Sequence, residues 1–218
     1  KNNMPRMAFY DLAIHPRDND LVLASHNRGI WILDNVAALQ ELSPDVAAKA
    51  AHVFSIEEAE QVRLSNPKAH AGDMIFRGEN PPAGAIIDFW LKGPATSISL
   101  TIHDASGQEV AKLTPSKNSG LNRAVWNLRH PSLPAQTYRY MDAERSRPLP
   151  GRLALPGVYT ARLVVDGAVS ERKFTVIEDR RLRVTPAART AWNRALETVA
   201  ASYLEATALI EQTKSASS

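Results

Sequence analysis

The twenty residues VYTARLVVDGAVSERKFTVI, at positions 158–177, predict a β-hairpin and with it a β-rich fold. Apolar and polar residues alternate on both sides of Asp166-Gly167, which is the pattern of two half-buried strands. Asp-Gly favours a two-residue type I′ turn because both central residues of that turn need a positive φ angle. The turn determines which residues of the two strands face one another, so the register follows from the sequence.

The predicted register puts an aromatic pair and a charged pair on opposite faces of the hairpin. Tyr159 faces Phe174 on the core side, and Arg162 faces Glu171 on the solvent side, where opposite charges are favourable. A slip by one residue would bury Arg162, so the register is well specified. The predicted pairs, from the turn outward, are Val165–Ala168, Val164–Val169, Arg162–Glu171 and Tyr159–Phe174.

Residues 72–180 as a whole predict an antiparallel β-sandwich, because alternation with a period of two recurs ahead of the hairpin. Trp126 lies in one such run and is assigned to the core. Trp90 alternates with core residues and is expected to point outward. The residues expected to face the core are Ile87, Phe89, Leu91, Ile98, Leu100, Ile102, Ala124, Trp126 and Leu128.

Residues 1–35 predict a smaller, separate sheet. Three short apolar runs, Phe9–Ile14, Leu21–Ala24 and Ile30–Leu33, are joined by polar turns, which is typical of a three-stranded meander. A sheet of three strands leaves two faces and two edges open to solvent. We therefore expect this sheet to need neighbours.

Residues 36–71 predict a connector with short helices. Ser43-Pro44 is a favourable helix start, with Ser43 as N-cap and Pro44 at the first helical position. The segment has no clear periodicity beyond these short elements, so we expect it to pack on another part of the protein and not to form a domain.

Residues 181–218 predict a long C-terminal helix, over 185–213, that begins at Thr185-Pro186. Its apolar residues recur at steps of four and three, which is the spacing of a heptad seam and indicates a partner helix. That partner is a second copy of the chain, which would make a homo-oligomer, or the connector, or a helix outside this sequence. The seam over residues 192–210 comprises Trp192, Leu196, Val199, Tyr203, Ala206 and Ile210.

The composition excludes several classes of protein. The net charge of the 218 residues is only +3, and basic and acidic residues are mixed, so we expect no nucleic-acid partner. No apolar run reaches the 18 residues of a membrane span. The absence of cysteine excludes disulfides, zinc–thiolate sites and cysteine nucleophiles.

The sequence contains no recognisable catalytic constellation. The six histidines have no metal-ligand spacing, and no nucleophile elbow, phosphate loop or dinucleotide fingerprint occurs. We therefore predict no catalytic residue, no metal ligand and no cofactor. The binding candidates are Trp90, which either stacks on a sugar or, as we favour, packs against a neighbouring domain, and His26 and Arg28 in the turn SHNRG.

Four stretches carry a resemblance to a known family. Residues 11–34, DLAIHPRDNDLVLASHNRGIWILD, resemble the last blade of large bacterial β-propeller proteins with sortilin-like, BNR-type repeats, which often carry the label of glycosyl hydrolase. Residues 76–91, 120–129 and 155–167 are similar to the domain that follows the propeller in that family. They also resemble the Ig-like or fibronectin type III-like domain of the flagellar hook-capping protein, and this resemblance implies that the predicted sandwich of residues 72–180 is an Ig-like antiparallel β-sandwich.

The resemblance implies a non-catalytic C-terminal accessory and assembly module. Residues 1–35 would be a residual last blade, the upstream propeller of the same protein would be the partner, and the location would be periplasmic or secreted. His26 and Arg28 are then candidates only within the complete ring of blades. The alternatives are a carbohydrate-binding sandwich that uses Trp90 and, less favoured, a hydrolase in its own right.

Overall fold

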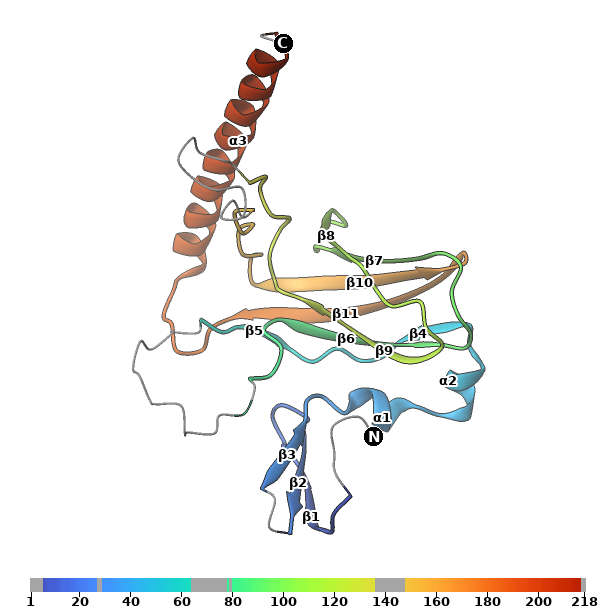
Figure 1. Ribbon diagram of the computed structural model, residues 1–218. Coiled ribbons are helices and arrows are strands. Elements are labelled where there is room, and N and C mark those ends of the chain that lie inside the picture. The colour runs from blue at the N-terminus through green and yellow to red at the C-terminus, as the bar shows by residue number, and fades with distance from the viewer. Residues whose placement is uncertain (1–5, 27–28, 64–77, 79, 136–147, 217–218) are drawn as a thin grey trace.

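A computed structural model describes residues 6–26, 29–63, 78, 80–135 and 148–216 of the chain. Over these residues the fold is mainly β, as predicted. A β-sandwich lies in the middle, a small three-stranded sheet extends from one end of it, and a long C-terminal helix extends from the other (Figure 1).

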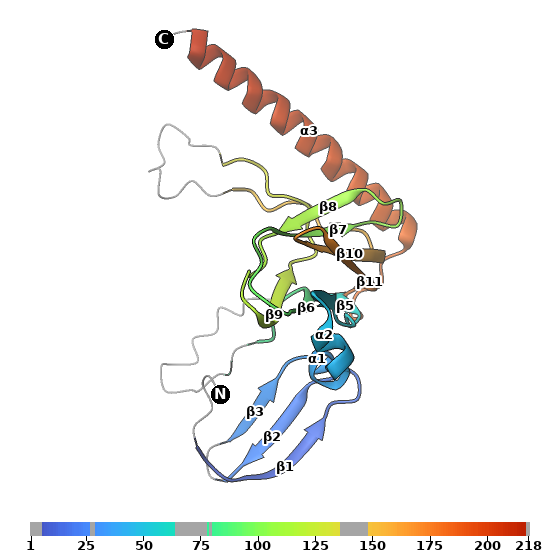
Figure 2. The ribbon, with the colours of Figure 1, turned by 90° about the vertical axis from the view of Figure 1, so that its right-hand side faces the viewer.

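The sandwich consists of two sheets. One has five strands in the order β5-β11-β10-β7-β8, and the other has three in the order β4-β6-β9 (Figure 2). All neighbouring pairs are antiparallel except β5 and β11, which run parallel. The strands are β4 (Ala51–Val53), β5 (Ala59–Gln61), β6 (Ala85–Leu91), β7 (Ile98–His103), β8 (Glu109–Leu113), β9 (Gly120–Trp126), β10 (Gly157–Val165) and β11 (Ala168–Glu178).

The hairpin of β10 and β11 has the predicted register throughout. Tyr159 pairs with Phe174 and Arg162 with Glu171, and the latter two side chains form an ion pair at 3.4 Å. The turn residues Asp166 and Gly167 have φ angles of 47° and 90°, as a type I′ turn requires. The alternation of this segment and its Asp-Gly turn therefore predicted the pairing register and the turn type correctly.

The core between the two sheets is filled by the side chains that alternation assigned to it. Ile87, Phe89 and Leu91 of β6 are completely buried, and so are Leu100 and Ile102 of β7. Trp126 is buried against the rings of Tyr159 and Phe174 (centroid distances of 5.2 and 6.1 Å), and its Nε1 donates to the carbonyl of Arg129 at 2.9 Å. A buried indole with its polar atom satisfied anchors this core.

The sandwich begins at Ala51, and not at residue 72 as the sequence predicted. Strands β4 and β5 lie within the expected connector, but β4 pairs with β6 and β5 pairs with β11. Each has only three residues, which is too short for a period of two to appear in the sequence. Pairing with the edges of longer strands, a tertiary effect, makes these segments extended.

The N-terminal sheet has the order β1-β2-β3, from β1 (Phe9–Ile14), β2 (Leu21–Ser25) and β3 (Ile30–Leu33). These bounds match the predicted runs to within one residue. Two short helices, α1 (Ala37–Glu41) and α2 (Pro44–Ala48), lead from this sheet to the sandwich. Ser43 caps α2 as expected, because its hydroxyl accepts from the amide of Val46 at 3.3 Å.

The C-terminal helix α3 (Pro186–Ala216) runs away from the sandwich (Figure 1). Thr185 caps its start, with its hydroxyl accepting from the amide of Ala188 at 3.2 Å. No helix among the described residues is long and apolar enough to cross a membrane.

Candidate functional site

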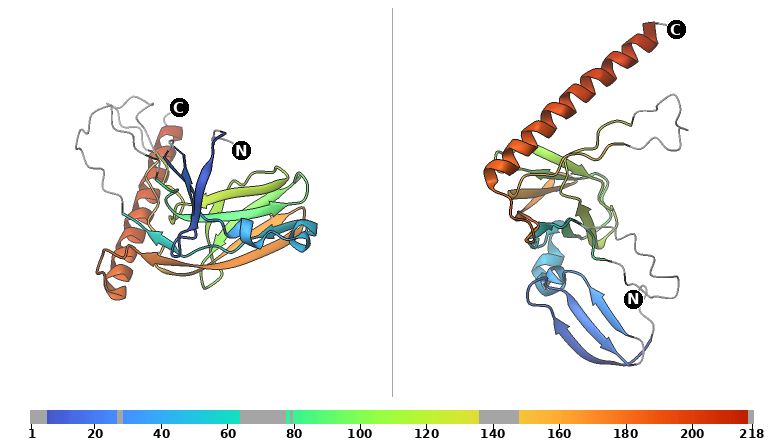
Figure 3. Two further views of the ribbon diagram at one scale, coloured as in Figure 1. Left: turned by 90° about the horizontal axis from the view of Figure 1, so that it is seen from below. Right: turned by 90° about the vertical axis from the view of Figure 1, so that its left-hand side faces the viewer.

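The N-terminal sheet is apolar on both of its faces. Residues that pair across antiparallel strands share a face, so Leu12 lies with Leu23 and Trp31, whereas Ala13 lies with Val22 and Ile32. Leu12 and Ile14 are 62% and 52% exposed on the first face, and Ile30 and Ile32 are 69% and 61% exposed on the second. Figure 3 shows this sheet projecting from the sandwich on the side opposite α3.

The two edges of this sheet differ. The outer edge of β1 carries a bulge between Phe9 and Asp11, and the Asp11 carboxylate accepts from the amide of Leu12 at 2.8 Å. Bulges and charged residues are the devices that keep a sheet edge from pairing. The outer edge of β3 is the stretch IWIL, which has no charge, no proline and no bulge. The edge of β3 is therefore the one suited to accept a further strand.

Polar contacts fix the sheet to the sandwich. The Asp20 carboxylate accepts from the amide of Asn35 at 2.9 Å, and the Asn19 carbonyl accepts from the amide of Val36 at the same distance. From the sandwich side, Arg123 donates to the Asn35 carbonyl at 3.0 Å. The joint is therefore held from both sides at Asn35.

Trp90 lies in the packing between connector and sandwich. It points outward from β6, as predicted, but it is half-buried against the cluster of Ala38, Val46 and Phe54, which the connector supplies. Its Nε1 is buried without a hydrogen-bond partner. In this arrangement the connector covers the ring that a sugar would stack on.

His26 lies at the tip of the N-terminal sheet and is exposed. Its ring meets Tyr10 edge-on at 5.0 Å, and its amide donates to the carbonyl of Ala8 at 3.0 Å. Arg28 lies outside the described residues. Among the described residues, no group of three or more histidine, aspartate or glutamate side chains could hold a metal ion.

The face of α3 that packs on the rest of the chain differs from the predicted seam. Arg189 and Asn193 are buried at its base, whereas Trp192 and Val199 of the seam are 61% and 65% exposed. The connector helices lie at the opposite end of the sandwich (Figure 1), so the connector is not the partner of this seam. The buried or half-buried positions are Arg189, Asn193, Leu196, Ala200, Tyr203 and Thr207.

Polar residues dock the base of α3. Arg152 donates to Asn193 at 3.0 Å and pairs with Glu197 at 2.8 Å, and it also contacts Nε2 of His130 at 2.6 Å. Burial, with the charge of Arg152 as a second cause, lowers the pKa of His130. A neutral His130 accepts from Arg152, so its deprotonated form supports the docked helix.

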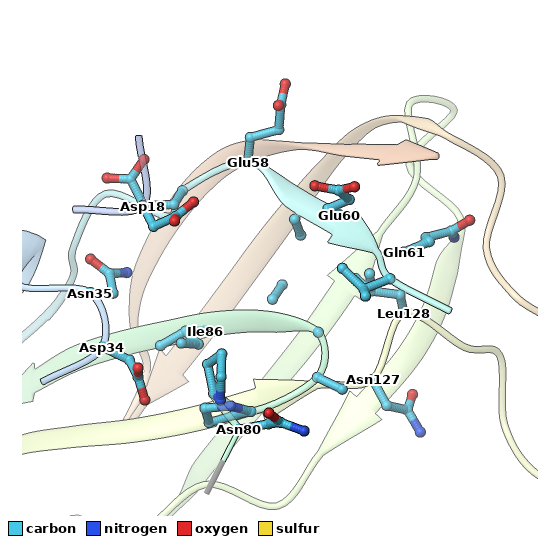
Figure 4. Close-up of a pocket in the computed structure, with 18 of the residues that line it drawn as sticks. Asp18, Asp34, Asn35, Glu58, Glu60, Gln61, Asn80, Ile86, Asn127 and Leu128 are labelled. Carbon is cyan, nitrogen blue, oxygen red and sulfur yellow. The ribbon is translucent and has the colours of Figure 1, made fainter. Parts of the chain in front are cut away.

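A cleft of about 790 Å³ opens between the N-terminal sheet and the sandwich. Figure 4 shows Asp34 and Asn35 at one end, Glu58 and Glu60 on the side of β5, and Asn80 opposite. Burial, and then the neighbouring Asp20 carboxylate, raise the pKa of Asp34. No pattern in the sequence indicates this cleft, because the residues that line it come from segments that only the tertiary fold brings together.

Comparison with known proteins identified no family for this chain. No protein-family model matches it. No curated protein matches it either. Among solved structures, the crystal structure of CopC from Methylosinus trichosporium OB3b aligns with a TM-score of 0.25 and 14% sequence identity, over 62% of this chain and 99% of that one. A TM-score of 0.25 does not relate the two folds.

Proposed function

We propose that this chain is a non-catalytic C-terminal accessory and assembly module, and that its N-terminal sheet is one blade of a β-propeller with sortilin-like, BNR-type repeats. The observation that carries the proposal is the exposure of large apolar residues on both faces of that sheet: Leu12 and Ile14 on one, Ile30 and Ile32 on the other.

A sheet with two apolar faces fits a position between two other sheets. A sheet at the surface of a domain usually has one polar face, so a sheet with two apolar faces has more apolar surface to bury than a single neighbour can cover. In a propeller, each blade packs between its two neighbours. The open edge of β3 would accept the fourth strand of the blade, and the upstream propeller of the same protein would supply both that strand and the flanking sheets.

The proposal includes a location outside the cytoplasm, periplasmic or secreted, which rests on the family resemblance. It also includes self-association through α3. Trp192, Val199 and Ile210 are exposed at heptad spacing, and no other described helix lies along them. Among the partners expected from the sequence, a second copy of the chain matches this spacing without requiring further sequence.

Hydrogen exchange tests the blade. The chain is compared with a longer protein in which it is joined to the polypeptide encoded immediately upstream. We expect that polypeptide to contain further repeats, and the amides of β1, β2 and β3 to exchange much more slowly in the longer protein. The amides of β10 and β11 should exchange equally in both.

Two variants sharpen this test. Ile32→Lys places a charge on one face of the blade and should abolish the added protection, whereas Val169→Lys, at an exposed position of β11, should leave it intact. An upstream sequence without such repeats, or equal exchange of β1–β3 in both proteins, would contradict the proposal.

A further inference from the structure

Two polar side chains in the cleft have unused hydrogen-bonding capacity. Asn35 is only 5% exposed, and its Oδ1 accepts from the amide of Ala37 at 3.0 Å, which fixes the orientation of the amide group. Its Nδ2 is left without a partner, and Figure 4 shows it directed toward the interior of the cleft. A buried donor without an acceptor is costly, because it has lost its hydrogen bonds to water.

The neighbouring Asp34 carboxylate is also unused. It accepts no hydrogen bond from any other described residue, although it lies at the same end of the cleft. No arginine that lines the cleft forms an ion pair with it: Arg17 pairs with Asp18 at 2.7 Å, Arg180 with Glu58 at 2.5 Å and Arg63 with Glu178 at 3.8 Å, and Arg129 donates to the carbonyl of Gly151 at 2.8 Å. One acceptor and one donor, adjacent in sequence, are therefore available at this end.

From these observations we infer that the cleft binds a neutral polyhydroxylated ligand, of the class of an oligosaccharide, through Asp34 and Asn35. A hydroxyl group both donates and accepts hydrogen bonds at the same oxygen, so the hydroxyl groups of one oligosaccharide can supply the donor that Asp34 lacks and the acceptor that Asn35 lacks. The inference is independent of the assembly proposal and of Trp90, which lies elsewhere.

Other ligand classes satisfy only part of this arrangement. An ammonium or guanidinium group would pair with Asp34, but it has no acceptor for Nδ2 of Asn35. In a peptide unit the N–H and C=O point in opposite directions, so one unit cannot serve two adjacent side chains on one wall. The apolar part of the cleft, which includes Pro81, Pro82 and Ile86, suits the C–H faces of sugar rings.

The test is a titration of the full 218-residue chain that is monitored by two-dimensional amide NMR. The probes are the neutral trisaccharides cellotriose, maltotriose and xylotriose, with putrescine as the cationic probe. We expect at least one trisaccharide to shift the side-chain NH₂ signal of Asn35. This signal is identified as the one that disappears from the spectrum of Asn35→Asp. No shift with any trisaccharide, or a shift with putrescine alone, would overturn the inference.

Three variants complete the test. Asn35→Asp keeps the acceptor for Ala37 and tolerates the positive φ of this position, 49°, but removes the donor. Asp34→Asn removes the charged acceptor. Each should weaken binding about tenfold, as the loss of one hydrogen bond does. Asp45→Asn, the same change at an exposed site in α2, should bind as the wild type does.

Thermal unfolding of each variant shows whether it is folded, and the titration of the wild-type chain reports whether a trisaccharide binds even if a variant does not fold. Trisaccharide binding that is equally strong in Asn35→Asp and Asp34→Asn would place the ligand elsewhere and overturn the assignment.

Discussion

The Arg123 guanidinium, on β9, donates two hydrogen bonds to the Asp88 carboxylate of β6, at 2.7 and 2.8 Å, and a third to the carbonyl of Asn35 at 3.0 Å. Asp88 is buried and lies on the outer face of its strand, and the charge of Arg123 compensates it there. This pair connects the sandwich to the joint of the N-terminal sheet.

Removing one partner of this pair should destabilise the protein. Arg123→Met leaves the buried Asp88 carboxylate uncompensated, and we expect a loss of about 2 kcal/mol in the free energy of unfolding, reduced from the value for a fully buried pair because Arg123 is partly exposed. The matched control is Arg162→Met, which breaks the exposed pair with Glu171 and should cost less than about 0.5 kcal/mol. Urea unfolding measures both, and equal losses would contradict the role of Asp88.

Gly84 should not tolerate a side chain. It has a φ angle of 132°, and a Cβ atom there would collide with the carbonyl of Trp126. We expect Gly84→Ala to lower the free energy of unfolding by roughly 2–4 kcal/mol. Gly93→Ala, where nothing lies near the added Cβ and no positive φ occurs, should change it by less than about 0.5 kcal/mol. A Gly84→Ala variant as stable as the wild type in urea would refute this prediction.

Asp34 should make the folded state less stable at neutral pH than below the ordinary pKa of aspartate. Its pKa is raised on folding, so the unfolded chain loses this proton at lower pH than the folded chain does. Stability therefore falls as the pH rises through this range. We expect Asp34→Asn to be more stable than the wild type at pH 7, and the difference to vanish below the ordinary aspartate pKa. Thermal melts across this pH range measure the difference, and a destabilised variant at pH 7 would contradict it.

His130 should contribute a pH dependence of the opposite sign. Its pKa is lowered on folding, first by burial and then by Arg152, so the unfolded chain binds a proton that the folded chain excludes. Stability should therefore fall as the pH drops below the ordinary histidine pKa. His130→Gln should flatten this slope, and Arg152→Met should reduce it without abolishing it, since burial remains. Chemical denaturation between pH 5 and 8 tests this, and an unchanged slope in His130→Gln would exclude it.

The exposed seam of α3 should govern the oligomeric state. The double variant Val199→Glu, Ile210→Glu places charges on the seam and should be monomeric in sedimentation velocity experiments at concentrations where the wild type associates. The control is Ala201→Glu, an exposed residue off the seam, which should associate as the wild type does. A wild type that is monomeric at every concentration would contradict self-association through this helix.

The sequence predicted the long, periodic elements well. The alternation on either side of Asp166-Gly167 specified a register that the structure confirms from Val165–Ala168 to Tyr159–Phe174. The start of α3 at Thr185-Pro186 followed from capping chemistry in the same way. Both depend on interactions between residues that are close in the chain, so local sequence carries the necessary information.

The short strands and the cleft could not be predicted. The strands β4 and β5 are extended because β6 and β11 offer them an edge, and three residues show no period of their own. The role of Asp34 and Asn35 depends on what faces them, and the residues opposite come from β5 and from the segment that leads into β6.

By itself, then, the sequence determined the hairpin, the core residues that alternate along the sandwich strands, the three-stranded sheet and the helix. The tertiary structure decided where the sandwich begins and which face of α3 is covered. It also decided that the connector covers the ring of Trp90, and that Asp34 and Asn35 line a cleft with residues distant in the chain. The physical reason is that periodicity and turn chemistry act within a few residues. Burial, charge compensation and edge pairing depend on groups that are distant in the chain and meet only when it folds.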